Sequence, residues 1–154
     1  MILKLFAKIW NGLPARARRD LVWLANAKFI HGVCGIILNQ EGQVLLLKHR
    51  FWKGQRWGLP SGLAHHGETP EATLRREVKE ETGLEVRVTK LLRVRNKGER
   101  VTEFLLLAEC TGEPSVRYGE ILEARFWDRA ELPENMLPAH RDELRESENV
   151  EVKR

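Results

Sequence analysis

The sequence predicts an α/β domain with a mixed β-sheet, preceded by a helical extension at the N-terminus. Three observations support this class: helix-like apolar spacing in the first 30 residues, strand-like apolar runs after them, and one sharply delimited helix in the middle. A chain of 154 residues is long enough for one domain with a sizeable core. We therefore expect an extension over residues 1–30 and a single domain over residues 31–154.

Residues 1–10 predict an amphipathic helix, and Pro14 opens a second candidate helix over residues 15–29. In the first helix one face is apolar and the lysines lie off it: Ile2, Leu5, Phe6 and Ile9, against Lys4 and Lys8. A secretory signal does not fit, because lysines interrupt the apolar stretch and no small-residue cleavage site follows. We favour packing of this extension on the domain or on the second subunit of a homodimer. The alternative is a basic helix that rests on an anionic membrane surface.

Strand-like segments begin at residue 31. Residues 31–38 and 43–50 predict a hairpin around a turn at 39–42, and a loop with glycines and a proline follows. The later elements are expected in this order: a helix over 70–82, strands over 84–94, 100–110 and 123–128, and a helix that begins near Pro138. Several strands combined with two or three helices make the α/β class with a mixed sheet.

The helix over residues 70–82 has clear end signals. Thr69 suits the N-cap, Pro70 the first helical position, and Gly83 the left-handed position that ends a helix. Leu74 and Val78 are four residues apart and form the expected buried stripe. Two basic residues are expected to face water: Arg75 and Lys79.

Composition and charge narrow the classes of function. The formal net charge is +4, a mild excess that suits anionic substrates but does not by itself indicate nucleic-acid binding. Cys34 and Cys110 each lie in an apolar run, which favours free core thiols in a reducing, cytoplasmic compartment over a disulfide framework. No apolar run approaches the roughly 20 residues of a membrane span.

Three carboxylates of the central helix share one face. Glu77, Glu80 and Glu81 have i, i+3 and i+4 spacing, so like charges become neighbours, and this destabilises a helix unless a cation lies between them. Clustered hard oxygen ligands suit Mg²⁺, with Mn²⁺ as a substitute. Such a metal neutralises phosphate charge and helps to activate water, and crowded acids have raised pKa values that suit a general base. The pattern therefore predicts hydrolysis of a phosphoanhydride.

The same segment resembles the signature of the Nudix hydrolases without a missing position. The matching residues are Gly62, Glu68, Arg76, Glu77, Val78, Glu80, Glu81, Gly83 and Leu84. The order of elements from about residue 31 to 145 is similar to the family, whereas the first 30 residues lie outside it. The resemblance implies a three-layer α/β/α sandwich and a magnesium-assisted attack of water on a small nucleoside diphosphate derivative, with no specific nucleic-acid partner.

The resemblance also implies roles for the signature residues. Glu80 and Glu81 would be the main metal ligands, with Glu80 part of the catalytic set, and Glu77 either a third ligand or the general base. Arg76 would orient the acids through an ion pair with Glu68. The carbonyl group of Gly62 would reach the metal.

Family members often add an acidic residue from a later loop. Glu120 lies at that place, just before the last expected strand, and is the candidate for a further metal ligand or catalytic acid. The alternative is an ordinary exposed loop acid. Glu123 is the weaker substitute.

Four residues are candidates for substrate binding, each with a simpler alternative. Lys48 and Arg50 belong to a basic run that is equally a solvated edge or a phosphate-binding patch. Trp52 would stack on a base unless it only packs in the loop, and His65 would contact a phosphate unless it only lies in water. Trp57 is expected to pack structurally.

The sequence leaves the substrate open. Nucleoside triphosphates, nucleotide sugars and ADP-ribose are all compatible, although the proline that marks many ADP-ribose hydrolases is absent from the stretch NKGERV. Two other classes stay open. One is a nucleotide-sensing module that binds without cleaving, against which the intact acids argue. The other is a hydrolase of a membrane-linked diphosphate, suggested only by the N-terminal helix.

Overall fold

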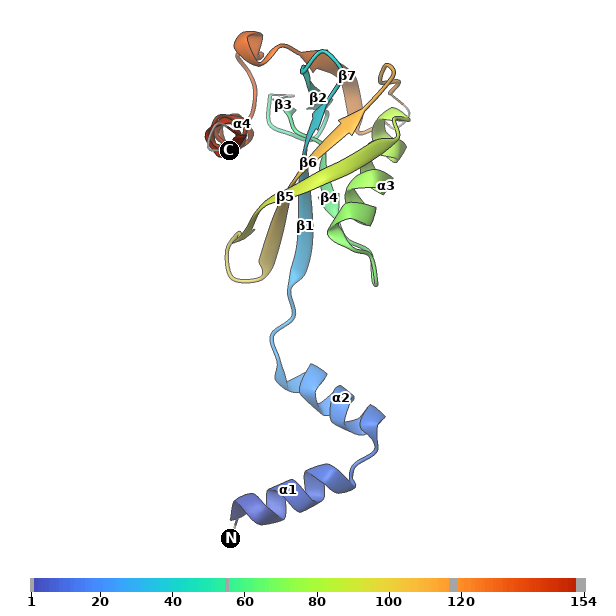
Figure 1. The fold of residues 1–154 in the computed structure, drawn as a ribbon, viewed down its shortest axis with the longest axis vertical. Helices are drawn as coiled ribbons and strands as arrows, with labels where there is room; N and C mark the ends of the chain where they lie inside the picture. The colour runs from blue at the N-terminus through green and yellow to red at the C-terminus, as the bar shows by residue number, and fades with distance from the viewer. Residues whose placement is uncertain (1, 55, 117–118, 152–154) are drawn as a thin grey trace.

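A computed structural model describes residues 2–54, 56–116 and 119–151, so the last three residues of the expected domain lie outside the described part (Figure 1). The expected helices and strands occur in the expected order, but the segment expected to be a loop contains two short strands, and a 3-10 helix precedes the last helix. The elements are α1 Ile2–Gly12, α2 Ala15–Ala25, β1 Ile30–Leu38, β2 Val44–His49, β3 Trp57–Gly58, β4 Ser61–Leu63, α3 Pro70–Thr82, β5 Val86–Asn96, β6 Val101–Cys110, β7 Ile121–Trp127, the 3-10 helix η1 Arg129–Glu131, and α4 Pro138–Glu151.

Helix α3 begins and ends where its sequence signals predict. The Thr69 hydroxyl oxygen accepts a hydrogen bond of 3.2 Å from the backbone N–H of Ala72, which satisfies one of the free donors of the first turn. Gly83 has a φ of 74°, a conformation that glycine adopts without a steric penalty. Leu74 and Val78 are fully buried, and Arg75 and Lys79 are exposed. The predicted helix is confirmed with both of its faces.

The strands form one mixed sheet, as predicted. Its main path runs β3-β2-β1-β6-β5, with β4 paired to β1 and β7 paired to β2. The pair β1·β6 is parallel, whereas the pairs β1·β2, β1·β4, β2·β3, β2·β7 and β5·β6 are antiparallel. The hairpin turn over residues 39–42 is present, closed by the Asn39 N–H donating to Gln43 O at 3.1 Å.

The predicted hairpin is shorter than expected. After the single pair Leu38↔Val44 the two strands separate. Beyond it, the edge of β1 that faces β2 pairs with β4, and the edge of β2 that faces β1 pairs with β3.

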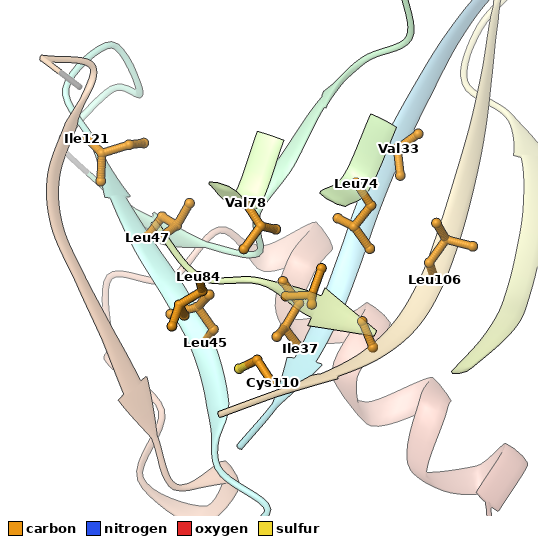
Figure 2. Packing of buried hydrophobic residues seen from close by; sticks show 12 residues of the cluster. Val33, Ile37, Leu45, Leu47, Leu74, Val78, Leu84, Leu106, Cys110 and Ile121 are labelled. Carbon is orange, nitrogen blue, oxygen red and sulfur yellow. The ribbon is translucent and has the colours of Figure 1, made fainter. Parts of the chain in front are cut away.

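Two apolar cores lie on opposite faces of the sheet, which gives the α/β/α sandwich. The first core contains Leu74 and Val78 of α3, packed with residues such as Val33 and Leu106 of the sheet (Figure 2). The second contains Leu144 of α4 with the other face of β1 and β2. Trp57 belongs to this second core and meets the Trp127 ring edge-on at 5.3 Å, so its predicted structural packing is confirmed.

The N-terminal extension is helical, as predicted, but it does not pack on the domain. Neither α1 nor α2 has a buried residue among those described, and Figure 1 shows both helices apart from the sheet, beyond the first residues of β1. The expectation of packing on the same chain's domain is therefore wrong for this structure. Among the described residues there is also no helix with the length and apolar character needed to cross a membrane.

Candidate functional site

Arg76 connects the start of α3 with its acidic face. Its Nε and Nη2 atoms donate to both carboxylate oxygens of Glu68, at 2.8 and 3.1 Å. Glu68 also accepts hydrogen bonds from the backbone N–H of His65 and the hydroxyl of Thr73, at 2.9 and 3.1 Å. The hydrogen bonds from Arg76 and the His65 backbone lower the pKa of Glu68 to about 2. The predicted pair is thus present, and it fixes a charged guanidinium beside the acids.

The other nitrogen of this guanidinium contacts the carboxylates of α3. Arg76 Nη1 lies 2.9 Å from Glu77 Oε1 and 3.3 Å from Glu80 Oε2. Burial raises the pKa of Glu77 even though the hydrogen bond from Arg76 opposes this change. The guanidinium therefore offsets part of the repulsion that the spacing predicts.

Gly62 has a steric reason to be glycine. A Cβ atom at this position would lie 2.1 Å from the carboxylate carbon and from Oε1 of Glu77, closer than real Cβ contacts allow. The backbone of β4 and the side chain of Glu77 can therefore approach only without a side chain at residue 62. This contact brings the Gly62 backbone, the predicted carbonyl ligand, next to the acidic face.

Glu81 has a buried carboxylate oxygen, Oε2, without a hydrogen-bond partner among the described residues. Burial, together with the charges of Glu77, Glu120 and Glu80, raises the pKa of Glu81 to about 8. A buried carboxylate oxygen that faces other acids is the environment that a cation stabilises.

These groups border one small cavity of about 310 Å³. Its lining is His65, Arg76, Glu77, Glu80, Glu81, Glu120 and Ile121. Glu120 immediately precedes β7, at the place that the sequence predicts, and its charge acts on Glu81. Glu123 lies outside the lining and pairs with Lys48 across β2 and β7, at 3.9 Å. Of the two candidate loop acids, the structure brings only Glu120 to the cavity.

The donor set of this cavity fits a divalent cation. Its lining contains four carboxylates beside a single histidine, His65, and one buried carboxylate oxygen has no partner among the described residues. Within the described residues, no three acidic, histidine or cysteine side chains already surround one point closely enough to bind a metal. The reason is visible in the contacts, because Glu77 and Glu80 are turned toward Arg76. Binding of an ion would require these side chains to rotate.

The four candidate substrate residues have different surroundings. His65 lines the cavity, whereas Lys48, Arg50 and Trp52 do not. Arg50 donates from Nε to the carbonyl of Gly119 at 2.8 Å. Trp52 stacks on the His49 ring with centroids 4.7 Å apart.

Two contributors to the site were missed in the sequence. Thr73 supports Glu68 through its hydroxyl group, and the carbonyl of Leu63 accepts a hydrogen bond of 3.0 Å from Arg76 Nη2. A threonine inside a helix that already has an apolar stripe is a weak signal for the first. A backbone carbonyl leaves no signal in the sequence.

Comparison with known proteins supports a common origin for this arrangement. A family model described as "NUDIX domain" matches residues 28–147, which confirms the resemblance seen in the sequence. The chain is 33% identical over 133 residues to the 8-oxo-dGDP phosphatase NUDT18 of Homo sapiens, covering 82% of this chain and 38% of that protein. It is 32% identical over 142 residues to an ADP-ribose pyrophosphatase of Methanocaldococcus jannaschii, covering 85% of this chain and 80% of that one.

A solved structure supports the same relationship. The crystal structure of the MutT NUDIX hydrolase from Burkholderia pseudomallei has a TM-score of 0.65 and 29% identity, over 77% of this chain and 97% of that chain. The match to the human phosphatase spans well under half of that protein's length, so its activity describes a longer molecule.

Proposed function

Because this chain belongs to the Nudix hydrolase family, we propose that it hydrolyses a phosphoanhydride bond in a small nucleoside diphosphate derivative, with Mg²⁺ as cofactor. Mn²⁺ would be an alternative metal. The observation that carries this proposal is the cavity in which Glu77, Glu80, Glu81 and Glu120 converge while one buried oxygen of Glu81 has no partner. Uncompensated negative charge at this place supports a site that is complete only with a cation and an anionic substrate.

The metal would be held by Glu80 and Glu81, with Glu77, Glu120 and the Gly62 carbonyl as further ligands. A bound divalent ion supplies positive charge that offsets the phosphate oxygens and favours deprotonation of a nearby water. Arg76 contacts Glu77 and Glu80 before an ion binds, and its own position is fixed by Glu68. His65, at the rim of the cavity, is the candidate phosphate contact that the lining supports best.

A proton acceptor must take the proton of the attacking water. Glu77 is the first candidate, because burial raises its pKa, and Glu120 is the second. The two possible roles of Glu77 give different kinetics. If Glu77 binds metal, Glu77→Gln raises the Mg²⁺ concentration needed for half-maximal rate; if it is the base, the substitution lowers kcat at saturating Mg²⁺.

The relatives suggest which substrates to test first. One relative is an 8-oxo-dGDP phosphatase and another an ADP-ribose pyrophosphatase, so oxidised guanine nucleotides and ADP-ribose are the leading candidates for this chain. Nucleotide sugars and ordinary nucleoside triphosphates complete the panel. A cytoplasmic setting belongs to this proposal, supported by the buried free thiols of Cys34 and Cys110.

The decisive experiment is a panel assay with the full chain and Mg²⁺. Hydrolysis of at least one compound to a mononucleotide supports the proposal, and Glu80→Gln should abolish it. Glu85→Gln is the matched control, because it removes the same charge from an exposed acid outside the cavity. If one compound binds tightly and every compound is recovered intact, the chain is a nucleotide-sensing module and the proposal is wrong.

A further inference from the structure

Helices α1 and α2 expose apolar side chains that no other described part of the chain covers. In α1 the side chains of Leu5, Phe6 and Ile9 are 61%, 68% and 59% exposed. Figure 1 shows both helices at the end of the molecule opposite β7, away from the sheet and from α3 and α4. Single exposed apolar residues are ordinary, but a contiguous exposed apolar face marks a surface for a partner.

The apolar faces of the two helices meet in a groove of about 400 Å³. Phe6, Ile9 and Trp10 line it from α1, and Leu21, Val22 and Ala25 line it from α2. Asn26 is the one polar residue of this lining. The groove is therefore an apolar surface formed by the extension itself.

The charged side of α1 lies opposite its apolar side. At 100° per residue, the large apolar residues from Ile2 to Trp10 fall within an arc of about 160°, and Lys4 and Lys8 lie on the opposite side. A helix with a wide apolar face and a lysine face is suited to the boundary between headgroups and acyl chains of a membrane. Aromatic rings such as those of Trp10 and Trp23 are also favoured at this boundary.

The charge of the whole chain is divided unevenly. Residues 1–30 contain six basic residues and one acidic residue, so their net charge is +5, while the chain as a whole carries +4. The remaining residues, 31–154, therefore carry a net charge of −1. All of the positive excess lies in the segment with the exposed apolar surface. A mainly positive, apolar segment is complementary to a surface that is anionic and covers hydrocarbon.

The start of α2 gives independent support for an anionic partner. Arg16, Arg18 and Arg19 lie in its first turns, and no acidic residue lies in the first turn. Cations at a helix N-terminus oppose the helix dipole and destabilise the helix when it is alone in water. Asp20 offsets this in part, through a contact of 3.7 Å with Arg19. Phosphate groups at this helix end would convert the unfavourable charges into favourable ones.

We propose that residues 2–28 are a peripheral membrane anchor that binds the surface of an anionic lipid bilayer. The apolar faces of α1 and α2 lie among the upper acyl chains, and the basic side chains of both helices contact phosphate headgroups. A second copy of the chain is the less suitable occupant. Joining two extensions would bring two segments of charge +5 together, and the domain of a partner, at −1, offers little opposite charge.

This proposal and the proposed hydrolysis can fail independently. The extension contributes no residue to the acidic cavity, so loss of membrane binding should leave hydrolysis of a soluble nucleotide unchanged. The anchor instead determines where in the cell the cavity operates.

Co-sedimentation of the full chain with lipid vesicles tests the proposal. The chain should sediment with vesicles containing about one third phosphatidylglycerol, should not sediment with pure phosphatidylcholine, and should be released by high salt. Lys4→Gln/Lys8→Gln should weaken binding about tenfold or more, since each basic residue near the surface contributes measurably. Phe6→Ser/Ile9→Ser should abolish it.

The matched control is Arg75→Gln/Lys79→Gln, which removes two exposed cations with the same i, i+4 spacing from α3. This variant should bind vesicles like the wild type. Equal weakening by both charge variants would mean nonspecific attraction and would overturn the proposal, as would the absence of sedimentation with anionic vesicles. A concentration-dependent dimer that Phe6→Ser/Ile9→Ser converts to a monomer, without vesicle binding by the wild type, would assign the surface to a second copy.

Discussion

Helices α3 and α1 are both amphipathic, but they differ in which side lacks a partner: the charged side in α3 and the apolar side in α1. In α3 the apolar side, Leu74 and Val78, is fully buried, while the charged side holds crowded acids and a buried oxygen of Glu81 without a partner. In α1 the charged side, Lys4 and Lys8, is in water, while the apolar side is exposed.

The comparison teaches where to look for a partner. Side chains that are buried within the fold, such as the apolar stripe of α3, have a structural role. Side chains without a partner in the fold indicate a binding partner. For the acids of α3 we propose a cation, and for the exposed apolar side of α1 a lipid surface. The predictions below test each half of this contrast.

The largest expected effect is on catalysis. Glu81→Gln removes a charge from the cavity and should lower kcat by about a thousandfold or more, which is about 4 kcal/mol of transition-state stabilisation. Without metal the same variant should melt at a higher temperature than the wild type, because glutamine avoids the cost of burying an ionisable group next to Glu77 and Glu120. Turnover assays and thermal melts with and without Mg²⁺ measure both effects. A variant with wild-type turnover would remove Glu81 from the metal site.

The next effect contrasts the apolar sides of the two helices. Leu74→Ala should lower the free energy of unfolding by about 2 to 5 kcal/mol, because it opens a cavity in a closed core. Leu5→Ala in α1 makes the same chemical change on an exposed surface and should change the free energy of unfolding by less than about 0.5 kcal/mol. Denaturant titration of both variants measures the difference. A large loss in Leu5→Ala would show that α1 is packed after all.

The third effect is a pH dependence that belongs to the charged side of α3. Glu81 has a folded pKa of about 8 against an ordinary value of 4.5, so the folded protein holds this proton more tightly than the unfolded chain. The associated stability is fully present below pH 4.5 and is lost as pH rises through 8. Metal-free wild type should therefore lose a few kcal/mol of stability over this range, at about 1.4 kcal/mol per pKa unit.

Two controls isolate this pH effect. Glu81→Gln has no titrating group at the position, so its metal-free stability should change less over the same range. Saturating Mg²⁺ should suppress the loss in the wild type, since a cation favours the charged carboxylate. A wild-type profile that rises toward pH 8 would contradict the assignment.

The smallest effect concerns the end of α3. Thr69→Ala removes the hydrogen bond from the Ala72 N–H and should reduce the free energy of unfolding by about 1 kcal/mol. Thr69→Ser keeps a hydroxyl oxygen at this position and should retain most of this stabilisation. Pro14, before α2, makes no side-chain cap, so α2 lacks an equivalent bond. Thermal unfolding measures this difference. Equal melting temperatures for the alanine and serine variants would show that the bond contributes nothing.

Local features of this fold could be predicted from the sequence because their causes are local. Thr69, Pro70 and Gly83 fix the ends of α3 through backbone chemistry within a few residues, and Pro138 does the same for α4. The acidic face of α3 is likewise a consequence of spacing along one helix. The Arg76–Glu68 pair was anticipated from the family signature.

Features that depend on distant segments could not be predicted. Apolar alternation identifies β2 as a strand but does not reveal that β7, rather than β1, is its main partner. Spacing along α3 does not show that the Leu63 carbonyl of β4 accepts a hydrogen bond from Arg76 Nη2. The same limit applies to α1, since an amphipathic pattern predicts an apolar face without predicting what covers it.

The position of Arg76 has a consequence for ion selectivity. Its guanidinium contacts Glu77 and Glu80, so in the proposed metal site an entering ion would compete with a permanent positive charge of the protein. A sodium or potassium ion brings no more charge than the guanidinium and donates no hydrogen bonds, so it gains nothing by the exchange. An ion with two charges does gain. In the proposed metal site, Arg76 would therefore favour divalent ions over the abundant monovalent ions of a cell.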